Sequence, residues 1–397
     1  MRLKLLLIPL VALAGVLGVS SYATAAHVPV TRTISVGGGG SGVAANDYFP
    51  NAITIHEDDT IHFANTYDEP HTVTYVPPAT DKPELIIPNP LGGPGQIFNP
   101  KAENPSNTGA GATAFDPHAY FNSGFMFKDA TADVTFDTTG SFKFLCLFHP
   151  GMELQVSVVS ETVAIASQAD LDKKGAAARD ALIAGGKAIA AGYQLTKTTD
   201  AGGTSTWFAQ AGGGAGQADV VQFLPVGSLS IKTGDTVHWS NPTFTPHTVT
   251  FTSGGEEPDL IATIPNPKGT PPSFDTFSPA ALFPAGGKTY DGTGLAHSGI
   301  FDASGEFPAG TEYSLTFTKP GTYNYICILH DDQGMKSTIV VSDRAAAPTT
   351  SVKPPSTGTG GMAGAQRGTW LPALLILGIA GLALVVAGAR ATVKHEA

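Results

Sequence analysis

Each of the two cysteines in this chain begins a compact cluster of possible metal ligands. In both clusters, two residues separate the cysteine from a histidine. A methionine follows this histidine after two more residues in the first cluster and after four in the second. A further histidine lies well upstream of each cluster, within a Pro-His-Thr-Val block. The eight candidate ligands are His71, Cys146, His149 and Met152 in the first set and His247, Cys327, His330 and Met335 in the second.

Each set offers two imidazoles, one thiolate and one thioether. Two histidines and a cysteine around one ion, with a weak axial methionine, are typical of a blue-copper electron-transfer site. The soft sulfur ligands favour copper, whereas a structural zinc site usually has another cysteine or histidine in place of the methionine. The sequence therefore predicts two copper ions in each chain, one at each set of ligands.

Other uses of these side chains are weaker. Outside the cell, Cys146 and Cys327 could instead form a disulfide. That bond would join equivalent strand ends and leave both His–Met pairs without a role. An isolated cysteine or methionine is more often part of a core, but here the same trio occurs twice at equivalent places. Three further histidines are minor metal candidates: His118, His297, and His27 if cleavage made it the N-terminus.

The segments that position the ligands repeat at a spacing of about 180 residues, which is the mark of a duplicated domain. Four blocks match in the same order. The matching blocks are 53–63 with 229–239, 70–75 with 246–251, 83–90 with 258–267, and 140–149 with 321–330.

Both repeats show the pattern of short, half-buried strands. Apolar and polar residues alternate, as at Ile53 and Ile55 or at Phe142 and Phe144. The 47 glycines and 30 prolines interrupt the chain too often for a helical bundle. Many short strands joined by turns favour a β-sandwich in each repeat. We therefore expect an all-β protein with sandwiches at residues 27–160 and 205–344.

The segment between the repeats, residues 161–204, is expected to be a partly helical linker. Ser167 followed by Asp170 resembles a capping box at the start of a helix. Three glycines between residues 175 and 186 would weaken this helix. The apolar residues expected on one helical face are Leu171, Ala178, Leu182 and Ile189.

The N-terminal segment has the features of a secretory signal peptide, residues 1–26. Arg2 and Lys4 precede an apolar run over residues 5–19, and Ala23-Thr24-Ala25 supplies the small residues of a cleavage site. The remaining chain is therefore expected outside the cytoplasm.

A second apolar segment near the C-terminus has the length of a membrane span. Residues 370–389 carry no charge and would cross a hydrocarbon core of about 30 Å as a helix. Arg390 and Lys394 follow, which predicts a cytoplasmic tail at 390–397. Residues 345–369, rich in Pro, Thr, Ser and Gly, would form a flexible stalk. These features predict a single-pass membrane protein with extracellular or periplasmic domains.

Both repeats resemble cupredoxins of the plastocyanin, amicyanin and halocyanin type. The resemblance covers about 70% of the chain and is carried by the ligand loops, by the Gly-Asp-Thr-Val-His-Trp strand at 234–239 and by the Gly-Thr-Tyr-x-Tyr-x-Cys strand at 321–327. It implies Greek-key sandwiches, a type 1 copper in each and electron transport as the function. It also implies that Thr72 and Thr248, which follow the upstream histidines, hydrogen-bond the cysteine sulfurs. Longer segments between the upstream histidine and the cysteine predict an insertion in each domain.

Multicopper oxidases and copper nitrite reductases also consist of cupredoxin repeats. Their catalytic copper typically needs a histidine immediately before the cysteine, where this chain has Leu145 and Ile326. No His-x-His pair occurs in the sequence either. We therefore expect a carrier and not an enzyme, while copper sequestration or delivery stays open as an alternative.

The charge of the chain bears on its partners. A net charge of −11 argues against nucleic acid, and the acidic repeats favour redox partners with basic patches or respiratory components of the membrane. In the cupredoxin family the downstream histidine lies nearest the surface, so its neighbours would form the docking patch. We expect two different partners, because the neighbours differ. They are Phe148, Pro150 and Gly151 around His149, and Leu329, Asp331 and Asp332 around His330.

Overall fold

The computed structural model describes residues 27–92, 95–109, 111–267 and 269–344. The predicted signal peptide, stalk, membrane helix and tail lie outside the described residues. Over the described ranges, no helix is both long enough and apolar enough to cross a membrane.

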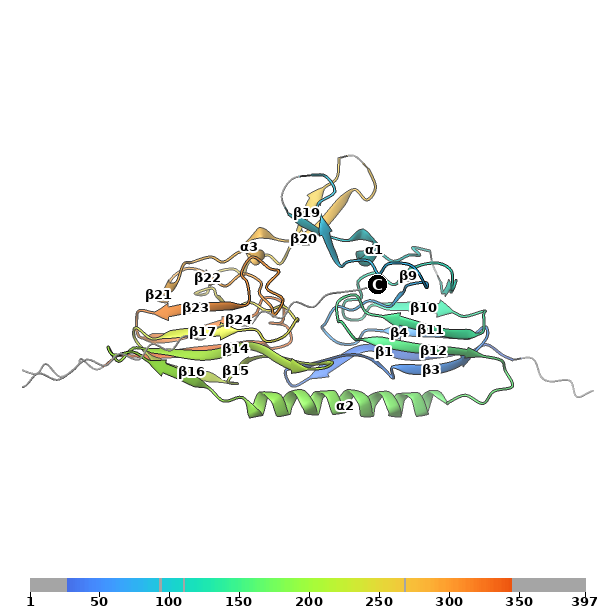
Figure 1. Cartoon of the computed structure of the whole chain (residues 1–397), viewed down its shortest axis with the longest axis horizontal. Helices are drawn as coiled ribbons and strands as arrows, with labels where there is room; N and C mark the ends of the chain where they lie inside the picture. Colours follow the sequence, from blue (N-terminus) through green and yellow to red (C-terminus); the bar gives the residue numbers. More distant parts are fainter. Residues whose placement is uncertain (1–26, 93–94, 110, 268, 345–397) are drawn as a thin grey trace, which may run out of the picture. The chain divides into compact units, whose positions relative to one another are not determined.

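The first repeat folds into two sheets on either side of one core (Figure 1). One sheet contains β2 (Val43–Phe49), β1 (Thr31–Gly40), β4 (Thr60–Ala64), β10 (Thr131–Thr135) and β8 (Thr113–Ala114) in this order. The other contains β3 (Ala52–His56), β12 (Glu153–Val159), β11 (Gly140–Leu145), β5 (Thr74–Tyr75) and β9 (Phe121–Asn122). Strands β4, β11 and β12 show the alternating burial predicted for half-buried strands.

The second repeat has the same arrangement, with β13 (Thr196–Thr199) added beside β14. Both repeats pair their first strand in parallel with a later strand, β1 with β4 and β14 with β17. The first sheet contains β15 (Ala218–Leu224), β14 (Ser205–Ala215), β17 (Thr236–Ser240), β23 (Glu312–Phe317) and β21 (Thr289–Tyr290). The second contains β16 (Ser228–Lys232), β25 (Lys336–Ser342), β24 (Gly321–Ile326), β18 (Thr250–Phe251) and β22 (Ala296–His297).

The two repeats share a sheet, which the sequence did not predict. Strand β2 pairs antiparallel with β15, with Val43 opposite Val220 and Ala45 opposite Ala218. This pairing joins the first sheet of each repeat into one sheet of 11 strands. Because backbone hydrogen bonds fix the register of such a junction, the two halves are coupled by more than their linker.

Helix α2 (Gln168–Gly192) occupies most of the predicted linker and packs against strands of both repeats (Figure 1). The side chain of Ser167 accepts a hydrogen bond from the Asp170 backbone, as the capping box predicted. Leu171 is buried, whereas Ala178 is exposed and does not belong to the packed face. Gly175 and Gly186 are buried instead. A Cβ at these positions would meet the Phe49 backbone and the Val43 side chain, respectively. These glycines allow close packing.

The insertions predicted between the upstream histidines and the cysteines form matching hairpins that touch each other. The first consists of β6 (Ile86–Pro88) and β7 (Gln96–Phe98), followed by α1 (Pro100–Glu103). The second consists of β19 (Ile261–Pro265) and β20 (Ser273–Phe277), followed by α3 (Pro279–Leu282). The rings of Phe98 and Phe277 lie 5.0 Å apart, and Thr276 donates a hydrogen bond to the Gln96 carbonyl.

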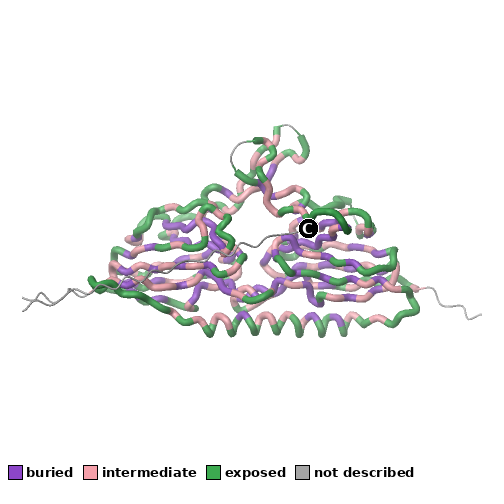
Figure 2. Tube along the Cα trace, in the orientation of Figure 1, coloured by how far each residue is buried: buried purple, intermediate pink, exposed green. Residues whose placement is uncertain are grey.

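Buried residues concentrate between the sheets of each repeat (Figure 2). The largest side chains differ between the two cores. Phe63 lies in the first core, whereas Trp239 takes the equivalent place in the second and donates a hydrogen bond to Tyr325. Each core also contains its cysteine and methionine, so these candidate ligands pack against buried apolar side chains.

Candidate metal centre

The first group of candidate ligands converges at one end of the first sandwich. The Cys146 Sγ atom lies 3.9 Å from Nδ1 of His71 and 3.6 Å from Nδ1 of His149. All three side chains are buried. Metal–nitrogen and metal–sulfur bonds are about 2.0–2.3 Å long, so one ion between these atoms would reach all three. The donor set therefore fits a trigonal copper site.

The second group has the same form. The Cys327 Sγ atom lies 3.8 Å from Nδ1 of His247 and 3.5 Å from Nδ1 of His330, and the two Nδ1 atoms are 3.1 Å apart. These residues are also buried. Both groups stand out among the described residues as sets of His and Cys atoms within 4.8 Å of one another.

A tight turn places each methionine beside its cysteine. The carbonyl of Met152 accepts a hydrogen bond from the Cys146 backbone, and the carbonyl of Met335 accepts one from Cys327. Both methionines are fully buried within the same cluster as their cysteine. This placement is compatible with the axial role that the sequence predicts for the two thioethers.

The threonine after each upstream histidine contacts the thiol as the family resemblance implied. The backbone N–H groups of Thr72 and Thr248 each donate to the cysteine Sγ at 3.3 Å. Their hydroxyls accept hydrogen bonds from the backbone of Leu147 and Ile328, the residues after the two cysteines. Each threonine thus fixes both the sulfur atom and the start of the ligand loop.

Two glycines that the sequence analysis missed lie directly against the upstream histidines. Gly37 and Gly212 have φ angles of 71° and 85° and sit at equivalent β-bulges. A Cβ at these positions would lie 2.0 Å from Nε2 of His71 and 2.2 Å from Nε2 of His247. Only glycine meets both requirements. Runs of glycine at equivalent places in both repeats were the available signal.

The ionisable side chains of both groups shift one another's pKa. Burial opposes ionisation of Cys146, but His149 and His71 outweigh it and hold the pKa of the thiol well below its usual range. In Cys327, His330 and His247 lower the thiol pKa in the same way. A thiol that ionises readily is ready to bind a metal ion, because the thiolate is the form that coordinates.

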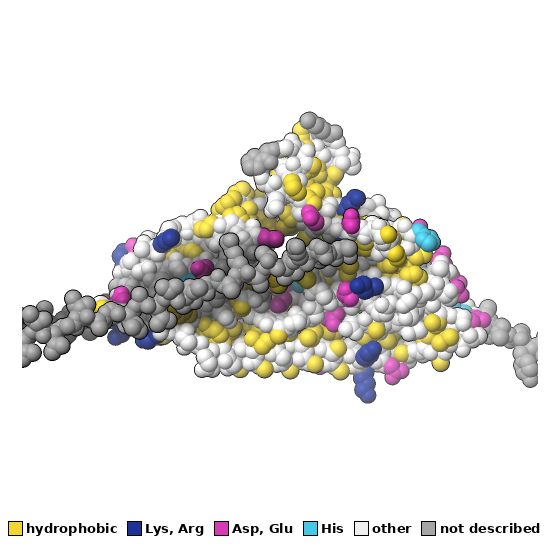
Figure 3. Space-filling view, viewed as in Figure 1, with side chains coloured by type: hydrophobic (Ala, Val, Ile, Leu, Met, Phe, Trp, Pro, Cys, Tyr) yellow, Lys and Arg dark blue, Asp and Glu magenta, His cyan; other side chains and the backbone are white. Residues whose placement is uncertain are grey.

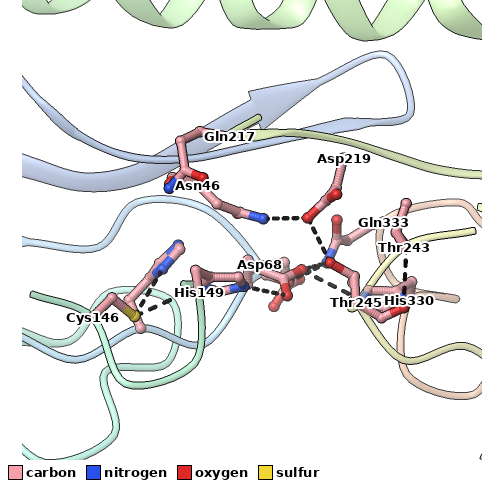
Figure 4. A network of polar contacts seen from close by, with 12 residues as sticks. Asn46, Asp68, Cys146, His149, Gln217, Asp219, Thr243, Thr245, His330 and Gln333 are labelled. Atoms are coloured by element: carbon pink, nitrogen blue, oxygen red, sulfur yellow. Dashed lines mark hydrogen bonds and ion pairs between the residues drawn. The ribbon is translucent and has the colours of Figure 1, made fainter. Parts of the chain in front are cut away.

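The two downstream histidines face a shared carboxylate across the junction between the repeats. Nε2 of His149 lies 3.5 Å from one oxygen of Glu69, and Nε2 of His330 lies 3.6 Å from the other. Burial opposes the positive charge, but the cysteines and Glu69 raise the pKa of both histidines to about 10. Figure 4 shows His149 and His330 approaching from the two sides of this network.

Glu69 itself is 4% exposed and well fixed. Its second oxygen accepts a hydrogen bond of 2.7 Å from the Gln333 amide, which belongs to the longer ligand loop of the second repeat. Burial would raise the pKa of Glu69, but His330 and His149 hold it well below its usual range. Close by, Asp219 accepts hydrogen bonds from Asn46 and Thr245 (Figure 4).

A cavity of about 1330 Å³ opens beside the two histidines, between the repeats and below the touching hairpins. Figure 3 shows this face hollowed beneath the hairpins, with acidic side chains near the opening. Three residues of the expected docking patches, Phe148, Pro150 and Leu329, line this cavity. Both downstream histidines are buried, which differs from the expectation of a ligand near the open surface. These three residues therefore face a common space.

The minor candidates have other partners. His297 is buried between Thr250 and the Ala281 carbonyl, and Asn122 has the equivalent contacts in the first repeat. Hence His297 corresponds in register to Asn122, and exposed His118 is unrelated to it. His27 lies near His56 and Asp59, and its ring N–H donates to the Asp59 carboxylate at 2.8 Å.

The disulfide alternative is excluded, because Cys146 and Cys327 are both free. Each thiol instead lies within its own group of histidines.

Known proteins resemble parts of this chain. The family described as copper binding proteins, plastocyanin/azurin family, matches residues 210–342. Plastocyanin from Scenedesmus fuscus is 30% identical over 114 residues, which are 29% of this chain and 81% of the relative. Among solved structures, a reduced amicyanin mutant is 16% identical with a TM-score of 0.20, and it covers 32% of this chain and 82% of its own. A Cu(I) amicyanin mutant is 20% identical with a TM-score of 0.19, covering 38% of this chain and all of its own.

Proposed function

This chain belongs to the plastocyanin/azurin family of copper-binding proteins, and from this premise we propose that it is an extracytoplasmic electron carrier with one type 1 copper in each repeat. The observation that carries the proposal is the duplicated group of two Nδ1 atoms and one Sγ atom. The ligands would be His71, Cys146, His149 and Met152 in the first site and His247, Cys327, His330 and Met335 in the second. Copper bound there would alternate between Cu(I) and Cu(II).

The surroundings of the ligands support a carrier. Backbone hydrogen bonds from Thr72 and Thr248 hold the sulfurs, and the upstream rings pack closely against Gly37 and Gly212. Such fixed ligands would rearrange little when the oxidation state changes. Their burial also speaks against delivery of the metal to another protein, because delivery needs ligands that a receiving protein can reach.

The position before each cysteine supports a carrier over an enzyme. Leu145 and Ile326 occupy the places where a catalytic copper would take a further histidine. The junction between the groups contains Glu69 and Gln333 and offers one carboxylate to the two outward-facing Nε2 atoms. This environment suits the passage of electrons better than the binding of oxygen or nitrite.

We further propose that the chain is anchored to the membrane by residues 370–389 after removal of residues 1–26, with its copper sites outside the cytoplasm. The supporting features are the charge-free apolar segment, the basic residues that follow it and the N-terminal signal pattern. Truncation before Thr369 should release soluble protein that still binds copper. Membrane-bound truncated protein would contradict the anchor.

Redox partners would reach the sites from the cavity side. Phe148, Pro150 and Leu329 offer apolar contact there, whereas Asp332 is exposed and Asp331 lies 3.9 Å from Lys336. Acidic groups near the opening favour partners with basic patches.

The experiment that tests the function is metal counting together with visible and electron paramagnetic resonance spectra of the copper-loaded chain. We expect two copper ions per chain and an intense thiolate-to-copper absorption. Colourless protein, or zinc in both sites, would contradict an electron carrier. Loss of copper to a small chelator within minutes would instead favour delivery.

A further inference from the structure

We propose that Glu69 joins the two metal sites into one pair that exchanges electrons within the chain, an inference that rests on the proposed function. The two ring nitrogens of each downstream histidine have different neighbours. Nδ1 of His149 and of His330 points to its own cysteine, at 3.6 and 3.5 Å. Nε2 of each points to one oxygen of the same carboxylate, at 3.5 and 3.6 Å. The carboxylate thus contacts one ligand of each site.

The electron path between the two sites contains few through-space steps. It runs through the His149 ring, the carboxylate of Glu69 and the His330 ring. Within each ring and within the carboxylate, the atoms are joined by covalent bonds. The only gaps are the two contacts between Nε2 and oxygen.

The side chain of Glu69 is held in place for this role. Its backbone carbonyl accepts a hydrogen bond from Asn65, and its carboxylate accepts one from Gln333. The same Gln333 amide also donates to the Asp68 carbonyl. With 4% of its surface exposed, Glu69 has little room to turn away from either ring. A buried carboxylate without such partners would be strongly unfavourable.

The bridge is built from features that differ between the repeats. The position equivalent to Glu69 is Thr245, whose hydroxyl donates to Asp219. Gln333 belongs to the two extra residues between His330 and Met335, which have no counterpart after His149. One repeat therefore supplies the carboxylate and the other supplies the amide that fixes it.

The exchange balances without any other reactant. One electron leaves the reduced site, which is oxidised from Cu(I) to Cu(II), and one electron arrives at the other site, which is reduced from Cu(II) to Cu(I). No bond forms or breaks and no proton is consumed. The downstream side chains are only 11% and 4% exposed, and Nε2 of each lies against Glu69.

The first test measures redistribution of electrons in the copper-loaded full chain. A Met152→Leu background distinguishes the two sites, because the axial ligand tunes the spectrum and potential of a blue-copper centre. A pulse of reductant delivers less than one electron per chain, and the absorption of each site is then followed. We expect a redistribution phase whose rate does not depend on protein concentration.

Variants then assign this phase to Glu69. Glu69→Leu should slow the redistribution about tenfold or more. Without the carboxylate, the two contacts between Nε2 and oxygen are replaced by one longer gap between the two rings. Glu69→Gln should slow it less, because an amide oxygen still accepts from one ring. The matched control Asp68→Asn removes the same charge from the neighbouring, partly exposed side chain and should leave the rate unchanged. Equal rates in Glu69→Leu and Asp68→Asn would overturn the proposal, and so would a rate proportional to protein concentration.

A second readout needs no copper. In the metal-free chain labelled with nitrogen-15 in histidine, Glu69→Gln should shift the Nε2 resonances of both His149 and His330, whereas Asp68→Asn should shift neither. A shift of only one resonance would overturn the shared bridge. If the chain bound no copper at all, the proposed function would fail, yet this measurement would still report on the bridge.

Discussion

The two repeats hold their cysteine and histidines alike but differ in what they present to each other. Around the ligands, Thr72 and Thr248 make the same contacts with sulfur, as do Gly37 and Gly212 with the upstream rings. Beyond the ligands, Glu69 stands where the second repeat has Thr245.

This difference shows which parts of a repeat are tied to the metal and which to the junction. The trigonal donor set restricts which residue types can lie beside it, so both repeats have the same residues there. The two outward Nε2 atoms need one acceptor between them, so a single repeat supplies it. The longer second loop then adds Gln333 to hold that acceptor.

The largest expected effect is the loss of a single site. Cys146→Ser should remove the first copper and leave the second, while Cys327→Ser should do the reverse, because the thiolate is the ligand that gives the blue-copper spectrum. Metal analysis and visible spectra of both variants check this. If either variant lost both coppers while remaining folded, the two sites would not be independent binding units.

The next largest effect concerns the glycines beneath the upstream histidines. Gly37→Ala and Gly212→Ala should each lower the free energy of unfolding by about 2–4 kcal/mol, since a left-handed backbone and a forced contact with the ring both add cost. Gly216→Ala is the matched control, because its φ of 60° is similar and its Cβ would meet nothing within 4 Å. Urea unfolding of the metal-free variants measures the difference. Similar losses in all three would show that the ring contact is unimportant.

A smaller effect separates three glycines of α2. Gly186→Ala should destabilise the chain by about 1 kcal/mol, because its Cβ would lie 2.5 Å from a methyl carbon of Val43. Gly175→Ala should act in the same direction through the Phe49 backbone. Gly185→Ala faces open space and should instead stabilise by about 0.5–1 kcal/mol through helix propensity. Thermal unfolding distinguishes these signs, and uniform stabilisation would refute the close packing of α2.

The smallest expected effect is a pH dependence at the touching insertions. Burial, together with the charge and a hydrogen bond of Asp275, raises the pKa of Glu103 to about 7. A raised carboxyl pKa means that the folded chain holds this proton more tightly than the unfolded chain. The contribution of Glu103 to stability is therefore highest below pH 4.5 and is lost as the pH rises to about 7. The pair is partly exposed, so the fall should not exceed about 1 kcal/mol.

Glu103→Gln tests this contribution, because an amide keeps the hydrogen bond and cannot ionise. Melting temperatures of the metal-free variant and of the unchanged chain should diverge between pH 4.5 and 7, with the variant less sensitive. Identical slopes in this range would show that the carboxyl pair does not couple the insertions.

The sequence allowed the ligands to be predicted because their chemistry depends on residue type and local spacing. The structure brings His71, Cys146 and His149 together, and likewise His247, Cys327 and His330. Glu69 could not be found in this way, since its role depends on the pairing of β2 with β15, which carries no sequence motif. The available signals were the mismatch of Glu69 with Thr245 and the longer second loop.

The helix between the repeats illustrates the same limit. Ser167 and Asp170 predicted where it begins, because capping is local. Its packed face was only partly predicted, since Gly175 and Gly186 are buried through contact with distant strands while Ala178 is exposed. Glycine lowers the stability of an isolated helix, but here these two glycines allow the helix to lie close to the sheet.

Anomalous scattering at the copper edge, from crystals of the copper-loaded chain, tests the central claim most directly. We predict two peaks, one between Nδ1 of His71, Nδ1 of His149 and Sγ of Cys146, and one between the matching atoms of His247, His330 and Cys327. A single peak, or a peak at His27, His56 and Asp59 in place of either group, would contradict an account in which each repeat holds one copper.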